Sequence, residues 1–293
     1  MPRYGEDVRV LIAGCGYVGT TLGLNLLAAG HTVAALRRSE ASLAALGALG
    51  FEPICADLTQ PASLRNVRAD WDWVVQCTAP AHPDVDTYET AYLESARTLL
   101  AWVDRVALRA FLFTSSTSVY GQEDGSWITE SSPAEPSSAT ARVLVRAEHE
   151  VLAASSSGLP TRILRVAGIY GPDRNRIAAL RRGEGIPGDR RHYVNMIHRD
   201  DVASAMVRVL ERGASGGIYH ASDGTPVLRG EFLAWLAHQL GIEPPPAVAF
   251  RTTAGARMGG HKRLCIDRLR HELGWEPRFP SFREGYAALL HAA

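Results

Sequence analysis

Residues 8–19 read VRVLIAGCGYVG, and this stretch decides the fold of the chain. Its first six residues predict a buried parallel strand, and the apolar segment that continues to Ala29 predicts a helix. Gly14 permits a tight turn, Gly16 lets the backbone approach a pyrophosphate, and Gly19 allows the helix to pack on the strand. The stretch therefore predicts a dinucleotide-binding βαβ unit, with a generic glycine-rich turn as the alternative.

Short β-branched runs alternate with helical patterns over the following 150 residues. The runs that predict strands are 32–36, 53–55, 73–77, 110–114 and 161–166, and the longest helical patterns cover 85–105 and 138–155. Strands that alternate with helices are typical of βαβ units, whose strands are parallel. The sequence therefore predicts an α/β fold with a doubly wound parallel sheet, the Rossmann arrangement.

The composition limits the classes of partner. The 293 residues include 31 Lys and Arg against 31 Asp and Glu, so no basic field is expected to hold nucleic acid. Four cysteines lie far apart without metal-ligand spacing and are expected to be buried thiols in a reducing cytoplasm. Neither a targeting segment nor a membrane span is expected, and no metal site is predicted. These patterns predict a cytoplasmic protein that binds small molecules.

The end of the second predicted strand should determine which dinucleotide is bound. An acid about 20 residues past the first glycine would bond a ribose 2′-hydroxyl, but this chain has Arg37 and Arg38 there. A guanidinium binds a 2′-phosphate that an acid would repel, so NADP(H) is favoured over NAD(H), with two solvated surface arginines as the alternative. Strand-end geometry adds five candidate cofactor contacts after the third and fourth strands: Asp57, Leu58, Cys77, Thr78 and Ala79.

Seven separated motifs give the chain a resemblance to a known family. They are FTSSTSVYG (113–121), LRVAGIYGP (164–172), VNMIHRDDV (194–202), IYHASDG (218–224), KRL (262–264), LGW (273–275) and PSFREG (280–285). Together with the glycine turn, they resemble the extended short-chain dehydrogenase/reductase superfamily, also called the NAD-dependent epimerase/dehydratase family. The resemblance covers nearly the whole chain.

The resemblance implies two domains and a set of site residues. The dinucleotide-binding domain would be formed by residues 1–170, and the chain would return to it with residues 196–223. The substrate lobe would be formed by residues 171–195 and 224–293. Ser116 matches the catalytic serine of the family, with a strand-end hydroxyl that caps backbone as the alternative. Further cofactor contacts are expected from Tyr17, Val18, Ser115, Ala167, Gly168 and Ile169. Weaker substrate candidates are Thr117, Arg174, Asn195 and His198.

The family's acid/base pair, a Tyr followed four residues later by a Lys, is missing. No tyrosine lies between Tyr120 and Tyr170, and the single lysine of the chain is Lys262. The Tyr position falls on Thr140 and the Lys position on Leu144, and neither side chain can replace its counterpart. A shifted register would instead pair Ser138 with Arg142. This departure matches the atypical YeeZ-type branch of the superfamily.

Two hypotheses of function follow from the sequence. The first is an NADP(H)-dependent oxidoreductase, epimerase or dehydratase that acts on a small carbonyl or sugar-like substrate and uses a nonstandard proton carrier. The second is a non-catalytic NADP(H)-binding sensor or regulatory protein. Either could be a monomer or a homodimer, since the apolar faces of 85–105 and 138–155 could pair between chains or belong to the core.

Overall fold

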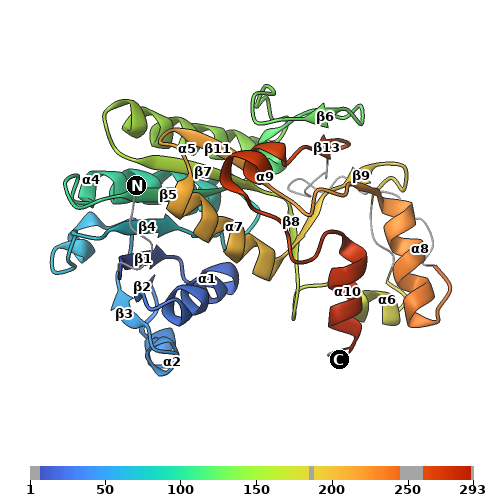
Figure 1. Ribbon diagram of the computed structural model, residues 1–293, viewed down its shortest axis with the longest axis horizontal. Coiled ribbons are helices and arrows are strands. Elements are labelled where there is room, and N and C mark those ends of the chain that lie inside the picture. Colours follow the sequence, from blue (N-terminus) through green and yellow to red (C-terminus); the bar gives the residue numbers. More distant parts are fainter. Residues whose placement is uncertain (1–6, 185–187, 245–259, 292–293) are drawn as a thin grey trace. The chain divides into compact units, whose positions relative to one another are not determined.

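The structure is a computed structural model that describes residues 7–184, 188–244 and 260–291 (Figure 1). Its main sheet has seven strands in the order β11-β7-β5-β4-β1-β2-β3. Their bounds are β1 (Arg9–Ala13), β2 (Thr32–Arg37), β3 (Glu52–Cys55), β4 (Trp73–Gln76), β5 (Ala110–Ser116), β7 (Thr161–Val166) and β11 (Gly217–Ala221). The pairs β1–β2, β2–β3, β1–β4 and β4–β5 are parallel, which confirms the predicted doubly wound sheet.

The strand order reverses between β1 and β4. From β1 the chain moves outward to β2 and β3, and then it returns to the other side of β1 with β4 and β5. In open parallel sheets, ligands bind outside the carboxyl ends of the strands at such a reversal. The glycine turn follows β1 directly, so the topology places it at this position.

Helices flank the sheet, and α1 (Tyr17–Ala28) and α5 (Ala139–Ser156) lie close to the positions that the sequence predicts. The segments η1 (Glu40–Ser42), α2 (Leu43–Ala48) and η2 (Pro61–Leu64) are further short helices. The predicted helix over 85–105 is divided into α3 (Val85–Tyr88), the π-helical segment η3 (Glu89–Glu94) and α4 (Ser95–Trp102). The widened turn presents the carbonyls of Ala91 and Tyr92 to the side chain of Gln76 at the end of β4. The sequence pattern gives no sign of this local change because it keeps a helical period.

Two compact units make up the chain. The first contains Met1–Ser116, Ser137–Arg165 and Ala203–Tyr219, and the second contains Thr117–Pro136, Val166–Val202 and His220–Ala293. The second unit therefore includes Thr117–Pro136, which the family resemblance assigns to the dinucleotide-binding domain. Helix α7 (Arg199–Arg212) contributes residues to both units.

The second unit combines short strands with helices. Its elements are η4 (Thr117–Val119), β6 (Trp127–Ile128), β8 (Gly168–Tyr170), α6 (Ile177–Arg181), β9 (Tyr193–Val194), β10 (Met196–His198), β12 (Val227–Leu228), α8 (Arg229–Leu240), β13 (Arg263–Leu264), α9 (Asp267–Leu273) and α10 (Phe282–His291). Strand pairs β8–β10, β9–β12 and β6–β13 form three small sheets. A buried apolar cluster that includes Tyr170, Phe232, Phe282 and Tyr286 forms a core of this unit.

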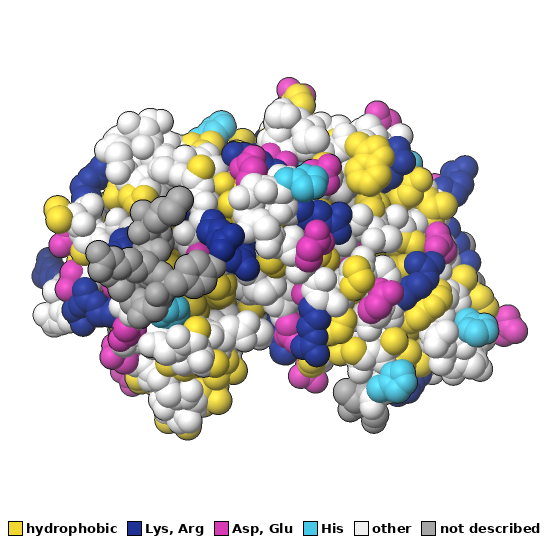
Figure 2. Space-filling view, in the orientation of Figure 1, with side chains coloured by type: hydrophobic (Ala, Val, Ile, Leu, Met, Phe, Trp, Pro, Cys, Tyr) yellow, Lys and Arg dark blue, Asp and Glu magenta, His cyan; other side chains and the backbone are white. Residues whose placement is uncertain are grey.

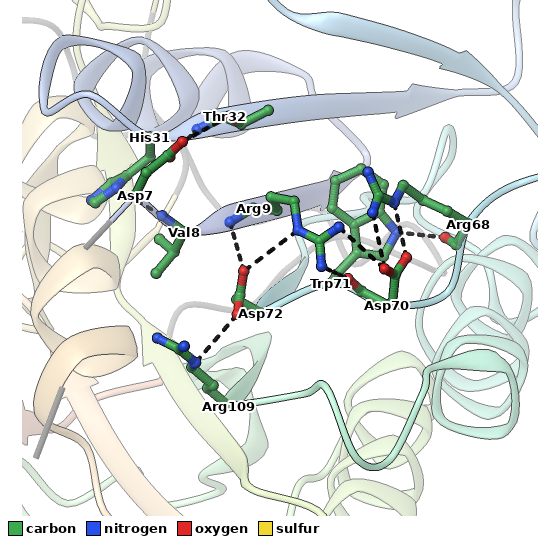
Figure 3. A network of polar contacts seen from close by, with 10 residues as sticks. All are labelled: Asp7, Val8, Arg9, His31, Thr32, Arg68, Asp70, Trp71, Asp72 and Arg109. Atoms are coloured by element: carbon green, nitrogen blue, oxygen red, sulfur yellow. Dashed lines mark hydrogen bonds and ion pairs between the residues drawn. The ribbon is translucent and has the colours of Figure 1, made fainter.

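Charged residues stabilise the amino-terminal side of the main sheet (Figure 3). The Asp72 carboxylate accepts a hydrogen bond from the Arg9 backbone amide at 2.9 Å and pairs with the Arg109 guanidinium at 3.2 Å. The Arg68 guanidinium holds the Asp70 carboxylate and lowers the pKa of that carboxyl. The Asp72 contacts join the starts of β1, β4 and β5, at the opposite ends of the strands from the glycine turn. We therefore assign them to fold stability.

The surface lacks a field of one sign on the face that Figure 2 draws, where acidic and basic side chains are intermingled. Equal totals of 31 basic and 31 acidic residues agree with this distribution. None of the helices in the described part of the chain is long and apolar enough to cross a membrane.

Candidate functional site

The turn after β1 requires glycine at two positions for packing reasons. Gly14 has φ +85°, and a Cβ atom there would lie 2.6 Å from the Cα of Thr78. A Cβ on Gly19 would lie 3.1 Å from both the Gly14 carbonyl oxygen and the Ile12 side chain. Because both approaches involve backbone, larger residues would push the turn away from β4 and α1 away from β1.

Gly16 differs, because packing within the protein does not require a glycine there. The nearest atom that a Cβ on Gly16 would meet is the Gly14 carbonyl oxygen, at an ordinary contact distance of 3.8 Å. Among the described residues no side chain caps α1, and its first turn carries no acid, beginning instead with Tyr17 and Val18. A helix N-terminus with a bare glycine turn is suited to bind an anion. These residues therefore fit the pyrophosphate of a dinucleotide.

The two arginines at the end of β2 occupy different environments. The Arg37 guanidinium donates a hydrogen bond from Nη1 to the Cys15 carbonyl at 3.1 Å, which ties the end of β2 to the glycine turn. Arg38 is exposed and has no side-chain bond within the described part of the chain. The end of β2 thus presents positive charge beside the turn.

The predicted contacts after β3 and β4 are mostly engaged in local structure. The Asp57 carboxylate accepts bonds from the backbone and hydroxyl of Thr59, and Leu58 is buried. Burial raises the pKa of Cys77 to about 12, so this thiol stays protonated at neutral pH. The Thr78 hydroxyl donates to the Ala91 carbonyl, and Ala79 is exposed. A dinucleotide would therefore meet backbone more than side chains along this edge.

The serine loop begins at the end of β5. Ser116 is half-buried, whereas the neighbouring Ser115 hydroxyl is buried and donates to Glu148 Oε1 at 2.6 Å. Glu148 in α5 is held by Arg165 in β7 through two bonds, from Nε at 2.9 Å and from Nη2 at 2.6 Å. Ser115 is thus fixed by a buried ion pair, and its contribution to a ligand would come from its backbone.

The sequence-based interpretation gave Glu148 and Arg165 no role. Both are charged residues at buried positions, since Arg165 lies in the buried part of strand β7 and Glu148 lies on the buried face of α5. Charged residues at such positions are rarely buried unless they are paired, and that signal could have identified them.

Neither proposed register of the missing acid/base pair produces one. Thr140 lies in the first turn of α5 with its hydroxyl 3.4 Å from that of Ser138, and Leu144 is buried. Ser138 caps α5 by accepting from the Ala141 amide, and Arg142 donates to the Ser137 carbonyl. Ser138, Thr140 and Arg142 therefore lie at the start of the helix, and Leu144 belongs to the core.

The remaining predicted site residues belong to the second unit. Thr117 begins η4, Ala167 is buried, and Gly168 and Ile169 lie in β8, where the Gly168 amide donates to the Asn195 carbonyl. The exposed Arg174 closes a tight turn by exchanging two backbone bonds with Gly171.

Asn195 and His198 have defined partners within the second unit. The Asn195 side chain donates to the Lys262 carbonyl and accepts from the Leu264 amide, both at 2.9 Å, so it holds β13 in place. His198 is buried and its Nδ1 accepts from the Asp200 amide at 3.2 Å. Burial lowers the pKa of this imidazole, which favours the neutral form.

The two tyrosines that bound the tyrosine-free stretch are buried. The Tyr120 hydroxyl lies 2.6 Å from His220 Nε2 and donates to the Thr129 carbonyl at 3.2 Å. The Tyr170 hydroxyl has no hydrogen-bond partner among the described residues, and burial raises the pKa of its phenol. Both rings are packed within the second unit, in agreement with a packing role.

Comparisons with known proteins agree with this geometry. The sequence model of the NAD-dependent epimerase/dehydratase family matches residues 10–222. The chain is 30% identical to the protein YeeZ of Escherichia coli K12 over 93% of this chain and 96% of YeeZ. A conserved protein of unknown function from Silicibacter pomeroyi has 29% identity and a TM-score of 0.78, covering 98% of this chain and 99% of that one.

A third relative has a dinucleotide in its structure. It is a double mutant of the dTDP-glucose 4,6-dehydratase DesIV from Streptomyces venezuelae with NAD bound. The identity is 26% and the TM-score 0.82, with coverage of 97% of this chain and 96% of DesIV.

Proposed function

This chain belongs to the NAD-dependent epimerase/dehydratase family, and from that premise we propose that it is an NADP(H)-dependent oxidoreductase, epimerase or dehydratase of a small carbonyl or sugar-like substrate. The observation that carries the proposal is the turn at Gly16. No contact within the described part of the protein requires a glycine there, and the turn leads into helix α1, which has no side-chain cap among the described residues. When bound, the dinucleotide would supply the hydride chemistry of its nicotinamide.

The residues that would hold the dinucleotide follow from their positions. The turn from Gly14 to Gly19 and the start of α1 would bind the pyrophosphate through backbone and helix dipole. Arg37 and Arg38 would bind the 2′-phosphate that distinguishes NADP(H), because a guanidinium forms strong charge-assisted bonds with phosphate. Arg37 is already oriented by its bond to the Cys15 carbonyl, which supports this assignment.

The substrate would have to react without the family's tyrosine and lysine. We assign Ser116 the task of donating a hydrogen bond to a substrate oxygen, since it is half-buried at the end of β5. A positioned general acid or base typically contributes ~10²–10⁴-fold in rate. The expected enzyme is therefore slower than relatives that have the pair, with the proton carried by water or by another side chain.

Two measurements test the proposal. Calorimetry should find affinity for NADPH that exceeds the affinity for NADH. Purified protein with NADPH and a panel of aldehydes and ketones should show loss of absorbance at the reduced-nicotinamide band. Absence of affinity for either dinucleotide would overturn the proposal. Tight binding without turnover, together with a partner whose affinity follows the cofactor's redox state, would favour the sensor instead.

A further inference from the structure

Lys262 is the only lysine among the 31 lysine and arginine residues of the chain. It is also buried, with 5% of the residue exposed, in the second unit. An arginine cannot lose its proton in a protein, whereas a buried lysine readily does. The position that holds a lysine is therefore the one where a neutral, nucleophilic amine can form.

The Lys262 amine is under-bonded for a buried cation. Its Nζ donates to the Tyr120 carbonyl at 2.9 Å, and this is its one hydrogen bond within the described residues. An ammonium group has three N–H donors, so two are left to be satisfied. Burial lowers the pKa of Lys262 to about 8, while the charge of Glu123 acts in the opposite direction.

A residue whose backbone lies near the amine, Gln122, also carries an acceptor atom that is unpaired within the described part of the chain. A Cβ atom on Gly260 would lie 2.7 Å from Lys262 Nζ and 3.2 Å from the Gln122 carbonyl oxygen, so the Gln122 backbone passes close to the amine. The Gln122 side chain donates from Nε2 to the Pro133 carbonyl, but its buried Oε1 has no partner among the described residues. An unpaired buried polar atom is costly, and a catalytic role or a bound small group is among its explanations.

The backbone that carries Lys262 is held firmly. The Asn195 side chain donates a hydrogen bond to the Lys262 carbonyl and accepts one from the Leu264 backbone amide. Strand β13 also pairs in parallel with β6. With the backbone fixed, burial of the side chain and the bond to the Tyr120 carbonyl restrain the position of the amine. Such restraint is what a reacting group needs.

We propose that Lys262 is a covalent ligand site, whose neutral amine captures a small aldehyde or ketone as an imine. The nitrogen lone pair attacks the carbonyl carbon, and the carbonyl oxygen takes up a proton to give a carbinolamine. Loss of that hydroxyl as water, with the second nitrogen proton, forms the C=N bond. Glu123, whose charge acts on this amine, would carry protons from nitrogen to the leaving oxygen, and the Tyr120 carbonyl would accept an N–H of the carbinolamine. The step requires no dinucleotide and is independent of the proposed function.

Reductive trapping tests this inference on the full chain. The protein is incubated with propanal and sodium cyanoborohydride, which reduces an imine to a stable secondary amine, and is then analysed by peptide mass mapping. Since the chain has one lysine, the α-amine at the N-terminus is the only competing site. We expect alkylation of Lys262 with a half-maximal rate near pH 8. Alkylation confined to the N-terminus would overturn the proposal.

Two controls separate reactivity from folding. When the protein is unfolded in urea, the pH at which Lys262 is alkylated at half its maximal rate should rise to about 10, near the ordinary pKa of lysine. A native midpoint equal to the unfolded one would contradict the proposal without any variant. Lys262→Arg should lose the internal label, keep the N-terminal label and retain its affinity for NADPH, because the glycine turn lies in the first unit. Loss of NADPH binding by wild-type protein would instead count against the proposed function alone.

Discussion

The Arg165 guanidinium and the Glu148 carboxylate form a two-bonded ion pair with only 5% and 2% of their side chains exposed. The Ser115 hydroxyl donates to the same carboxylate, so the pair connects β7, α5 and the end of β5. Ser116 follows directly in the chain. A buried ion pair therefore sets the backbone from which the proposed catalytic hydroxyl extends.

Removing one partner of this pair should be strongly destabilising. Arg165→Met leaves a buried carboxylate without its cation, and we expect unfolding to become easier by about 3–5 kcal/mol. Urea unfolding followed by circular dichroism measures the change. The matched control is Arg97→Met, which breaks the exposed pair with Glu150 on the same helix α5 and should cost less than about 1 kcal/mol. Equal losses for the two variants would contradict the assigned role.

The glycines of the turn should separate folding from binding. Gly14→Ala forces a Cβ to within 2.6 Å of the Thr78 backbone at a positive φ, so it should lower the unfolding free energy by at least about 1–2 kcal/mol. Gly16→Ala meets only an ordinary contact and should unfold like the wild type, yet bind NADPH at least roughly tenfold more weakly, about 1.4 kcal/mol. Thermal melts and calorimetry make the comparison. NADPH binding unchanged in Gly16→Ala would remove the pyrophosphate from this turn.

Charge at the end of β2 should control the choice of dinucleotide. Arg38→Ala removes a cation with no role in folding among the described contacts, so the affinity for NADPH should fall by about 10–100-fold, as expected for a lost bond to phosphate. The affinity for NADH should stay the same. Arg181→Ala, an exposed arginine in the second unit, is the control for general charge effects. A parallel loss for both dinucleotides would contradict a 2′-phosphate contact.

Asp223 should make stability depend on pH. Burial raises the pKa of this carboxyl to about 8, because only 1% of the residue is exposed and one oxygen lacks a partner among the described residues. The folded state therefore keeps a proton that the unfolded state loses near pH 4, and stability should fall as the pH rises from about 4 to 8.

Urea midpoints measured between pH 5 and 8 test this dependence. Asp223→Asn resembles the protonated carboxyl and should flatten the decline. Burial also raises the pKa of Glu130, so part of the dependence of stability on pH should remain in Asp223→Asn. A slope that is identical in wild type and variant would show that Asp223 is ionised in the folded protein.

The two hydroxyls assigned from the family resemblance should behave differently in catalysis. With the carbonyl panel and NADPH, Ser116→Ala should lower kcat/KM by roughly 10²-fold, since it removes a hydrogen bond to the substrate oxygen. Thr140→Val should leave the rate nearly unchanged, because its hydroxyl lies in the first turn of α5 beside Ser138. A larger effect at Thr140 than at Ser116 would reverse these assignments.

The sequence alone determined that the chain forms a doubly wound parallel sheet with a dinucleotide turn after its first strand. Both depend on local information: apolar strand runs of fixed length, and glycines at Gly14, Gly16 and Gly19 whose backbone requirements are set within a few residues. It also determined that the Tyr and Lys of the family are missing, because Thr140 and Leu144 are simply different residues. The chemical identity of a position needs no tertiary structure.

Only the tertiary structure decided which side chains meet across the sequence. Glu148 and Arg165 pair across 17 residues, and the Lys262 amine reaches the Tyr120 carbonyl across 142. Periodicity carries no record of such pairs, because burial of a charged group depends on what the fold brings beside it. The same is true of ionisation: the pKa values of Asp223 and Lys262 are shifted by burial, a property that arises only when the chain has folded.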